Sequence, residues 1–139
     1  MTAVDRLTYR VTAHSVDRHH SIAQTKEAEI GLDTDLAGQA ELFNPVELLL
    51  AAMAACMLKG IARVASMLEF ALRGARIELS AIRQNSPPRI TRIDYVLTID
   101  SDEPDHRLEL LHKNIRKYGT ISNTLAGSTV VEGHIARQA

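Results

Sequence analysis

The residue with the clearest capacity for chemistry is Cys56, the only cysteine in a chain of 139 residues. A thiolate is a strong nucleophile that can be oxidised reversibly to a sulfenic acid, whereas the neutral thiol reacts slowly. Lys59 and Arg63 follow at i+3 and i+7, so they share its face on a helix, and either cation would favour the thiolate in a common pocket. Both cations can equally be solvent-facing charges, and a free cysteine can equally be a small buried hydrophobic residue.

Histidines are the next candidates, and their spacing argues against a metal site. His19 and His20 are adjacent, so on a strand their side chains would point to opposite faces. His106 and His112 are six residues apart, which places them on different faces of a helix. The serine, asparagine and threonine at 122–124 lack a histidine and an acid in a recognisable order, so we expect them to form a turn or a cap. We predict neither a metal nor another cofactor.

The composition is that of an ordinary globular chain, with 45% hydrophobic and 24% charged residues. A length of 139 residues suits a single core, so we expect one domain over residues 1–139. Aromatic residues make up only 4% and tryptophan is absent, so aliphatic side chains must fill the core. The formal net charge is −1 and no block of lysine or arginine occurs, which argues against nucleic-acid binding.

The sequence indicates a cytoplasmic protein that does not enter a membrane. A single cysteine cannot form an intramolecular disulfide, so nothing indicates an oxidising compartment. The stretch from Met1 to Leu7 carries charge and lacks the apolar centre of a signal peptide. The longest apolar run extends from Leu48 to Leu58, is closed by Lys59, and is too short to span a bilayer.

The elements that must position these residues begin with extended segments. Apolar residues at 7, 9, 11 and 13 alternate with polar ones, which is the period of a strand with one buried face. A second extended run is predicted over 21–32. Residues 33–43 mix polar and apolar side chains around Gly38 and are predicted to form a loop.

The strongest predicted element is a long helix that carries the cysteine. Asn44 is a good N-cap, and Pro45 suits the first turn because its missing N–H would have no partner there. The helix is expected to run to about Leu72, with Gly74 as the stop signal. Residues 48–57 are apolar on every side, so the helix must be enclosed by a sheet or by a second subunit.

The remaining elements are a hairpin, a second helix and a final strand. Strands are predicted over 76–83 and 90–99, joined by a turn that contains two prolines. Pro104 opens an amphipathic helix that ends at the C-cap Gly119. A last strand is predicted over 129–135, so the fold class is α+β. The apolar stripe of the second helix is expected to consist of Leu108, Leu111, Ile115 and Tyr118.

Two motifs connect this arrangement to a known family. Residues 44–56, Asn-Pro-Val-Glu-Leu-Leu-Leu-Ala-Ala-Met-Ala-Ala-Cys, resemble the first signature of the OsmC/Ohr superfamily, named for osmotically inducible protein C and organic hydroperoxide resistance. Residues 118–125, Tyr-Gly-Thr-Ile-Ser-Asn-Thr-Leu, resemble its second signature, and the element order matches across nearly the whole chain. The resemblance implies an OsmC-like fold with antiparallel sheets around a long central helix. It also implies an intertwined homodimer whose two sites lie at the subunit interface.

The resemblance further implies a chemistry for the cysteine. In catalytic members of the family, a first cysteine attacks a hydroperoxide as the thiolate and becomes a sulfenic acid, which a second cysteine captures as a disulfide. A dithiol reductant then resets the enzyme. An arginine lowers the pKa of the first cysteine, and a glutamate holds that arginine.

This chain matches the site of the family only in part. Cys56 occupies the position of the first cysteine, whereas Gly119 stands at that of the second and Val46 at that of the glutamate. Glu47 matches a neighbouring position that is acidic in many relatives, but nine residues at about 100° each place it opposite Cys56 on the helix. Arg18, between the first two extended runs, is the nearest candidate for the arginine.

Two functions of different classes follow as alternatives. The first is a one-cysteine peroxidase that reduces a small organic hydroperoxide in oxidative-stress defence and is reset by an external thiol reductant. The second is a non-catalytic homodimer that binds a small hydrophobic ligand at the subunit interface. We predict Cys56 and Arg18 as catalytic residues. Glu47, Met53 and Lys59 are predicted as binding residues.

Overall fold

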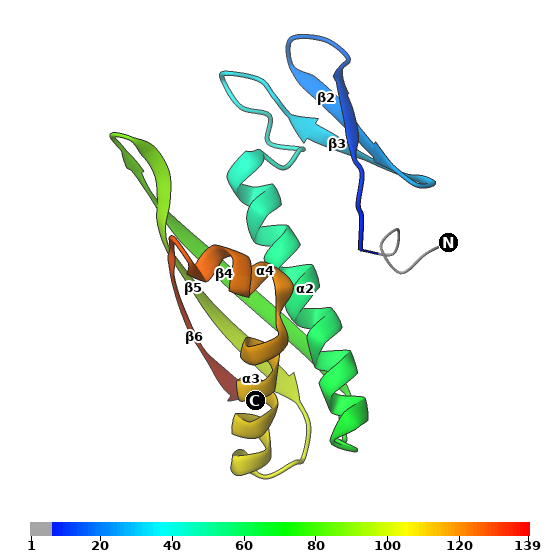
Figure 1. Ribbon diagram of the computed structural model, residues 1–139, viewed down its shortest axis with the longest axis vertical. Helices are drawn as coiled ribbons and strands as arrows, with labels where there is room; N and C mark the ends of the chain where they lie inside the picture. Colours follow the sequence, from blue (N-terminus) through cyan, green and yellow to red (C-terminus); the bar gives the residue numbers. More distant parts are fainter. Residues whose placement is uncertain (1–6) are drawn as a thin grey trace. The chain divides into compact units, whose positions relative to one another are not determined.

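The structure is a computed structural model that describes residues 7–139 (Figure 1). Contacts divide the chain into two compact units, one up to Leu48 and one from Leu49 onward. The prediction that the first residues lack a signal peptide falls on residues 1–6, which lie outside the described part. The elements in chain order are β1 (Thr12–Ser15), β2 (His20–Thr25), β3 (Ala28–Asp33), α2 (Pro45–Met67), β4 (Gly74–Asn85), β5 (Pro88–Asp100), α3 (Asp105–Tyr118), α4 (Thr120–Ala126) and β6 (Val130–Arg137). The predicted α+β class is confirmed.

The first unit contains an antiparallel sheet of order β1-β2-β3. The prediction of one extended run over 21–32 is wrong, because the chain reverses at Lys26, whose φ of 53° lies in the left-handed region. Ile22 therefore pairs with Gly31 across the two strands. Glycine or asparagine is the usual sequence signal for such a turn, and the lysine at this position gives no such signal.

The chain before β1 carries apolar side chains that remain uncovered. Leu7, Tyr9 and Val11 alternate with polar residues as noted, but β1 begins only at Thr12. The three side chains are 78%, 84% and 66% exposed, respectively. The strand predicted over 7–13 is therefore largely wrong, because alternation does not supply the partner strand that pairing requires. The segment leaves an apolar strip without cover within the described chain.

The loop between β3 and α2 is held by Asp33, whose residue surface is only 8% exposed. Its carboxylate oxygens accept the N–H of Asp35 at 3.1 Å and the N–H of Gln39 at 3.0 Å. The N–H of Asp33 donates to the carbonyl of Phe43 at 3.0 Å. Gly38 has a φ of 89°, a conformation that L side chains rarely adopt, and it permits the turn inside the loop. The predicted loop is confirmed, and its backbone is fixed by these bonds.

The long helix α2 begins with a reciprocal cap. Asn44 Oδ1 accepts the N–H of Glu47 at 2.9 Å, and Glu47 Oε1 accepts the N–H of Asn44 at 3.0 Å. These bonds satisfy two backbone donors that have no partner inside the helix. The predicted N-cap at Asn44 and the start at Pro45 are confirmed.

The same helix ends earlier than predicted. It stops at Met67 rather than near Leu72, and Gly74 begins β4 instead of terminating the helix. Glu69 adopts the left-handed conformation with a φ of 51°. The left-handed residue that follows the end of the helix is thus a glutamate, whereas the prediction expected a glycine there.

The second unit contains a sheet of order β4-β5-β6. β4 and β5 form the predicted antiparallel hairpin, with both strands longer than expected. β6 pairs with β5 in parallel, with Tyr95 opposite Gly133 and Leu97 opposite Ile135. This pair departs from the antiparallel pattern because α3 and α4 return the chain to the other end of the sheet before β6 begins (Figure 1).

One aliphatic core joins the sheet to α2 and α3 in this unit. Leu108, Leu111 and Ile115 of α3 are buried as predicted, whereas Tyr118, the fourth residue of the predicted stripe, is 54% exposed. Alternate residues of β5 point into the same core. The buried hydrophobic residues are Met53, Met57, Ile61, Val64, Ala65, Phe70, Ile93, Tyr95, Leu97, Ile99, Leu108, Leu111, Ile115 and Val131.

Helix α2 buries only one stripe of its surface within the chain. Leu58 and Met67 are exposed, so the described chain encloses the helix only in part. The prediction that the apolar run is too short to span a bilayer considered residues 48–58 alone, and the whole helix is longer. By length and composition α2 could cross a membrane, although the core helices of soluble proteins pass the same test. The uncovered face carries Leu58 and Met67 beside the exposed charges of Lys59 and Arg63, and a partner could cover its apolar part.

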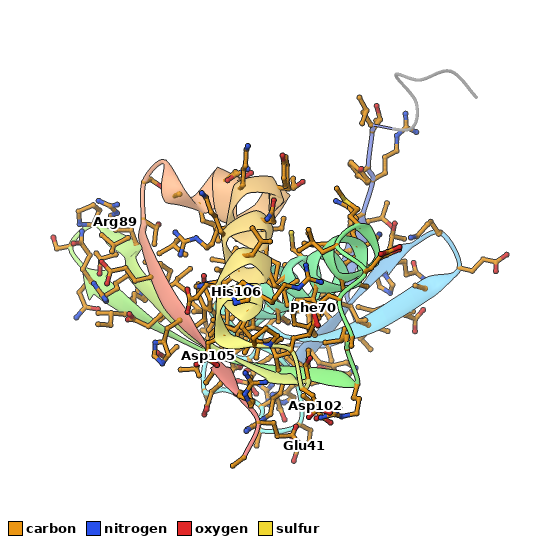
Figure 2. All side chains as sticks on the ribbon, turned by 90° about the horizontal axis from the view of Figure 1, so that it is seen from below. Glu41, Phe70, Arg89, Asp102, Asp105 and His106 are labelled. Atoms are coloured by element: carbon orange, nitrogen blue, oxygen red, sulfur yellow. The ribbon has the colours of Figure 1, made fainter. Side chains whose placement is uncertain are left out.

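Ion pairs connect the loops at one end of the second unit. Arg73 lies 2.9 Å from carboxylate oxygens of both Asp100 and Asp102, and Arg137 lies 2.8 Å from Asp105. Figure 2 shows Asp102 and Asp105 at this end, seen along α3. Solvent screens these exposed pairs, so they orient the connections more than they stabilise the fold.

Candidate functional site

Cys56 lies in the middle of α2 with its side chain half-buried. Met53 and Met57, the buried residues on either side of it, belong to the core. One turn further on, a Cβ built on Gly60 would lie 3.8 Å from Cγ2 of Ile115 in α3. The cysteine is therefore one helical turn away from a close contact between α2 and α3.

Gly119, the residue matched to a second cysteine, lies on the same side of that contact. The helices α2 and α3 run in opposite directions (Figure 1). Cys56 is one turn before Gly60 on α2, and Gly119 is one turn after Ile115 on α3. Both residues therefore lie beyond the contact toward the same end of the unit, which is the arrangement that the two signatures imply.

Space, rather than backbone conformation, accounts for a glycine at position 119. Gly119 is the C-cap of α3, as predicted, but its φ of −77° is open to any residue. A Cβ there would lie 3.1 Å from the carbonyl oxygen of Ile115 and 3.2 Å from Oγ of Ser122. Within residues 7–139, that hydroxyl is buried without a hydrogen-bond partner. The turn predicted over 122–124 is wrong, because these residues lie inside α4, but the predicted cap hydrogen bonding occurs: Asn123 Nδ2 donates to the carbonyl of Lys117 in the last turn of α3 at 3.2 Å.

Arg18 lies in the turn between β1 and β2 of the first unit. Its Nε donates to Nε2 of His19 at 3.4 Å. Among the described residues, no carboxylate forms an ion pair with Arg18. Arg18 and Cys56 belong to different units, so the assignment of Arg18 to the cysteine pocket stays a prediction.

The two neighbouring histidines each have their own carboxylate. Nδ1 of His19 lies 2.7 Å from Oδ2 of Asp35, and Nδ1 of His20 lies 3.1 Å from Oδ1 of Asp17. Hydrogen bonds from the N–H of Ala37 and from the His19 side chain hold the pKa of Asp35 below its usual value. The two rings therefore bond to different carboxylates.

The three predicted binding residues have different surroundings. Glu47 caps α2, which gives its carboxylate a structural partner. Met53 is fully buried in the core, whereas Lys59 is exposed, as is Arg63. Their roles as ligand-binding residues stay predictions.

A partly buried polar network that the sequence did not reveal lies between β5 and α3. The hydroxyl of Tyr95 lies 2.6 Å from Nε2 of His112, and Arg116 donates to the same hydroxyl at 3.1 Å. Arg116 also donates to the carbonyl of Val131 at 3.1 Å. Because Arg116 donates to the hydroxyl oxygen, the hydroxyl proton is available to Nε2 of His112 when that nitrogen carries a lone pair. His112 and Arg116 at i, i+4 are the one signal that could have found this network.

Burial shifts both titratable partners of this network away from their charged forms. It raises the pKa of Tyr95, an effect that the positive charge of Arg116 opposes. Burial, reinforced by the charge of Arg116, lowers the pKa of His112 below the value of 6.5 expected in an unfolded chain. The folded protein therefore holds His112 neutral, as the acceptor that Tyr95 requires.

This shift predicts a loss of stability in mild acid. Below pH 6.5 the unfolded chain binds a proton at His112 that the folded chain resists, so the contribution of this group is complete above that pH and declines as the pH falls. A glutamine at position 112 keeps an acceptor for Tyr95 but does not titrate. We expect thermal unfolding at pH 8 and pH 5 to show a smaller acid-induced drop in Tm for His112→Gln than for the unmodified protein. Equal drops would contradict this account of His112.

A groove of about 560 Å³ adjoins the network. Tyr95 and Arg116 line it together with acidic side chains and His134, so it carries charges of both signs. This mixture does not select a class of ligand, and the groove is not assigned to the cysteine site.

Comparison with known proteins gives these features a family context. The family model described as OsmC-like protein matches residues 38–133, which include both signatures. A search of curated proteins found no match.

Solved structures resemble the chain over nearly its whole length. The OsmC-like protein from Mycoplasma pneumoniae is 19% identical, with a TM-score of 0.87 over 95% of this chain and 98% of the other. The organic hydroperoxide resistance protein OsmC from Legionella pneumophila is 20% identical, with a TM-score of 0.70 over 93% and 96%. OhrB of Bacillus subtilis is 18% identical, with a TM-score of 0.67 over 93% and 98%. At these identities the likeness shows the fold.

Proposed function

The chain belongs to the OsmC-like protein family, and on that premise we propose that it reduces organic hydroperoxides through Cys56, its only cysteine, with an external thiol as reductant. The observation that carries this proposal is the half-buried position of Cys56 on α2, at the end of the first signature and beyond the α2–α3 contact from Gly119. Relatives of the same fold include the organic hydroperoxide resistance proteins of Legionella pneumophila and Bacillus subtilis. Their names support the substrate class.

The first step of the proposed reaction is an attack by the thiolate on the peroxide. The Cys56 sulfur bonds to one peroxide oxygen, the O–O bond breaks, and the leaving alkoxide takes a proton to become an alcohol. The sulfur is oxidised to a sulfenic acid, and the hydroperoxide is reduced. Arg18 is the proposed cation that favours the thiolate, with Lys59 and Arg63 as the alternatives on α2.

The second step needs thiols from solution, because Gly119 provides no second cysteine. One external thiol attacks the sulfenic sulfur and releases water, which leaves a mixed disulfide on Cys56. A second thiol then displaces the cysteine as a thiolate and leaves as the oxidised disulfide. Such a thiol pool is typical of the cytoplasm, which is the location that we propose, in the context of oxidative-stress defence.

Turnover in the presence of a small thiol tests this function. With cumene hydroperoxide and excess dithiothreitol, we expect continuous consumption of hydroperoxide at a rate that rises with the thiol concentration. Without the thiol, the fast phase should consume about one equivalent per chain, followed only by the slower consumption that oxidises the sulfenic acid to the sulfinic acid. A rate above background that does not respond to thiol would contradict the proposed second step.

The substitution Gly119→Cys should restore an intramolecular second step. The φ at position 119 is open to any residue, but the new Cβ would press on the carbonyl oxygen of Ile115 at 3.1 Å and on Oγ of Ser122 at 3.2 Å, so both must give by a few tenths of an ångström. After one equivalent of hydroperoxide, non-reducing peptide mapping should find a disulfide between the introduced cysteine and Cys56. Gly119→Ser, with similar bulk and no thiol, is the matched control and should form none. Sulfenic acid that persists in Gly119→Cys would show that the two positions are too far apart.

We also propose that the protein acts as a homodimer. The uncovered face of α2, with Leu58 and Met67, and the apolar strip of Leu7, Tyr9 and Val11 support a second copy of the chain as the missing cover. Sedimentation at micromolar concentration should report twice the mass of one chain. A stable folded monomer would contradict this proposal.

The second candidate is a non-catalytic dimer that binds a small hydrophobic ligand at its interface. The valine at position 46 and the glycine at position 119 favour this function, because two residues of the catalytic pattern are missing. In that case Met53 and Lys59 would contact the ligand, and Cys56 would stay unmodified in excess hydroperoxide.

A further inference from the structure

We propose that His19 and Asp35 are positioning residues that hold the guanidinium of Arg18 in one orientation and leave its positive charge unpaired. This inference rests on the proposed function, in which Arg18 favours the thiolate of Cys56. All three residues belong to the first unit, and the hydrogen bonds between them carry the argument.

The protons on the His19 ring follow from its two partners. Arg18 can only donate, so Nε2 of His19, at 3.4 Å from Arg18 Nε, must present a lone pair. The ring proton then resides on Nδ1, which lies 2.7 Å from Oδ2 of Asp35 and donates to it. The carboxylate thus selects the tautomer that accepts from Arg18.

Asp35 is itself fixed by the loop that follows β3. Its Oδ1 accepts the N–H of Ala37 at 2.9 Å, and its Oδ2 accepts a bond from Nε2 of Gln39 at 2.9 Å. The side chain is only 14% exposed. The buried carboxylate of Asp33 holds the backbone of this loop. The hydrogen bonds that run from Arg18 through His19 to Asp35 therefore end at a loop whose backbone is fixed.

A neutral histidine ring and a carboxylate have different effects on the charge of an arginine that they orient. A glutamate beside Arg18 would neutralise part of its charge, whereas neutral His19 fixes Nε and leaves the net charge of the guanidinium intact. Within residues 7–139, the two terminal nitrogens of Arg18 have no hydrogen-bond partner, so both can face an anion such as a thiolate. Position 46, where the resemblance expects the glutamate, is a valine.

Nitrogen NMR of the histidine side chains tests the hydrogen-bond arrangement without reference to activity. At pH 8 we expect His19 to be in the Nδ1–H form, with Nε2 unprotonated. Asp35→Asn should shift the ring toward the Nε2–H form, because an amide at position 35 can also donate to Nδ1. Nε2–H as the main form in the unmodified protein would overturn the proposal.

The rate of Cys56 oxidation by cumene hydroperoxide, measured in single turnover, tests the effect on Arg18. His19→Phe, which has no acceptor, should lower the rate about tenfold at pH 8, as expected when a charged group loses its alignment. His19→Gln can accept through its amide oxygen and should retain most of the rate.

His20→Phe is the matched control, because His20 bonds to Asp17 and not to Asp35. Its rate should equal that of the unmodified protein. Equal losses in His19→Phe and His20→Phe, or no loss in His19→Phe, would overturn the positioning role. If the unmodified protein does not react with hydroperoxide, the proposed function fails, and the NMR measurement still decides whether His19 presents Nε2 to Arg18.

Discussion

Replacement of Cys56 by serine is expected to lower the rate of hydroperoxide reduction by about a thousandfold or more, to the level of the buffer. The thiolate sulfur attacks the peroxide and exchanges a weak O–O bond for a stronger S–O bond, whereas a serine oxygen would have to form another weak O–O bond. The hydroxyl also stays protonated at neutral pH, so no anion is available for the attack. The rate is measured as the loss of cumene hydroperoxide with excess dithiothreitol.

The fold should survive this substitution. The side chain of Cys56 is half-buried, and serine removes little volume, so the variant should unfold at nearly the same temperature as the unmodified protein. Cys56→Ala provides a second variant that cannot introduce a new hydroxyl. Residual turnover in both folded variants would place the chemistry outside the only cysteine of the chain.

The substitution Gly133→Ala should have the largest effect on stability. A Cβ at this position would lie 2.5 Å from three ring atoms of Tyr95, which faces Gly133 across the parallel pair of β5 and β6. The ring is only 2% exposed and is held by His112 and Arg116, so it has no room to move. We expect a loss of about 3 kcal/mol in the free energy of unfolding. That loss corresponds to about 10 °C in Tm.

Gly127→Ala is the matched control for this substitution. A Cβ there would lie 3.8 Å from the carbonyl oxygen of Thr124, which is ordinary van der Waals contact, and Gly127 has the right-handed helical φ of −68°. Its Tm should stay the same or rise slightly, because alanine restricts the unfolded chain more than glycine does. A similar loss in both variants would mean that the contact with Tyr95 is not the cause.

Local signals in the sequence predicted the elements that local interactions determine. Asn44 and Pro45 marked the start of α2 correctly, because a cap is formed by residues within one turn. The β4–β5 hairpin and the start of α3 after Pro104 were also predicted, since each depends on neighbouring residues.

The errors occur where tertiary structure overrides a local preference. Lys26 and Glu69 adopt left-handed conformations that composition assigns to glycine, so one strand was predicted for two and α2 was predicted too long. The parallel pairing of β6 depends on the path of α3 and α4 rather than on the residues of the strand. The alternation of apolar and polar residues from Leu7 to Val11 indicates an apolar face, but it does not show whether a neighbouring strand pairs with the segment.

The candidate site also has parts that the sequence predicted and parts that it did not. Cys56 and Gly119 were identified by motif, and both lie on the same side of the contact between Gly60 and Ile115. The bond between His19 and Asp35 joins residues sixteen positions apart across a sheet and a loop, so no local pattern could reveal it. The i, i+4 spacing of His112 and Arg116 is a local signal, but Tyr95 meets them only when α3 packs on β5.

The central claim is that the sulfur of Cys56 accepts an oxygen atom from an organic hydroperoxide. Peptide mass spectrometry of the unmodified protein, after one equivalent of cumene hydroperoxide in the presence of dimedone, tests it most directly. We expect the dimedone adduct of a sulfenic acid on the peptide that contains Cys56, and with excess oxidant and no dimedone the sulfinic acid on the same residue. A Cys56 peptide that stays unmodified after prolonged exposure would contradict the claim and favour the ligand-binding dimer.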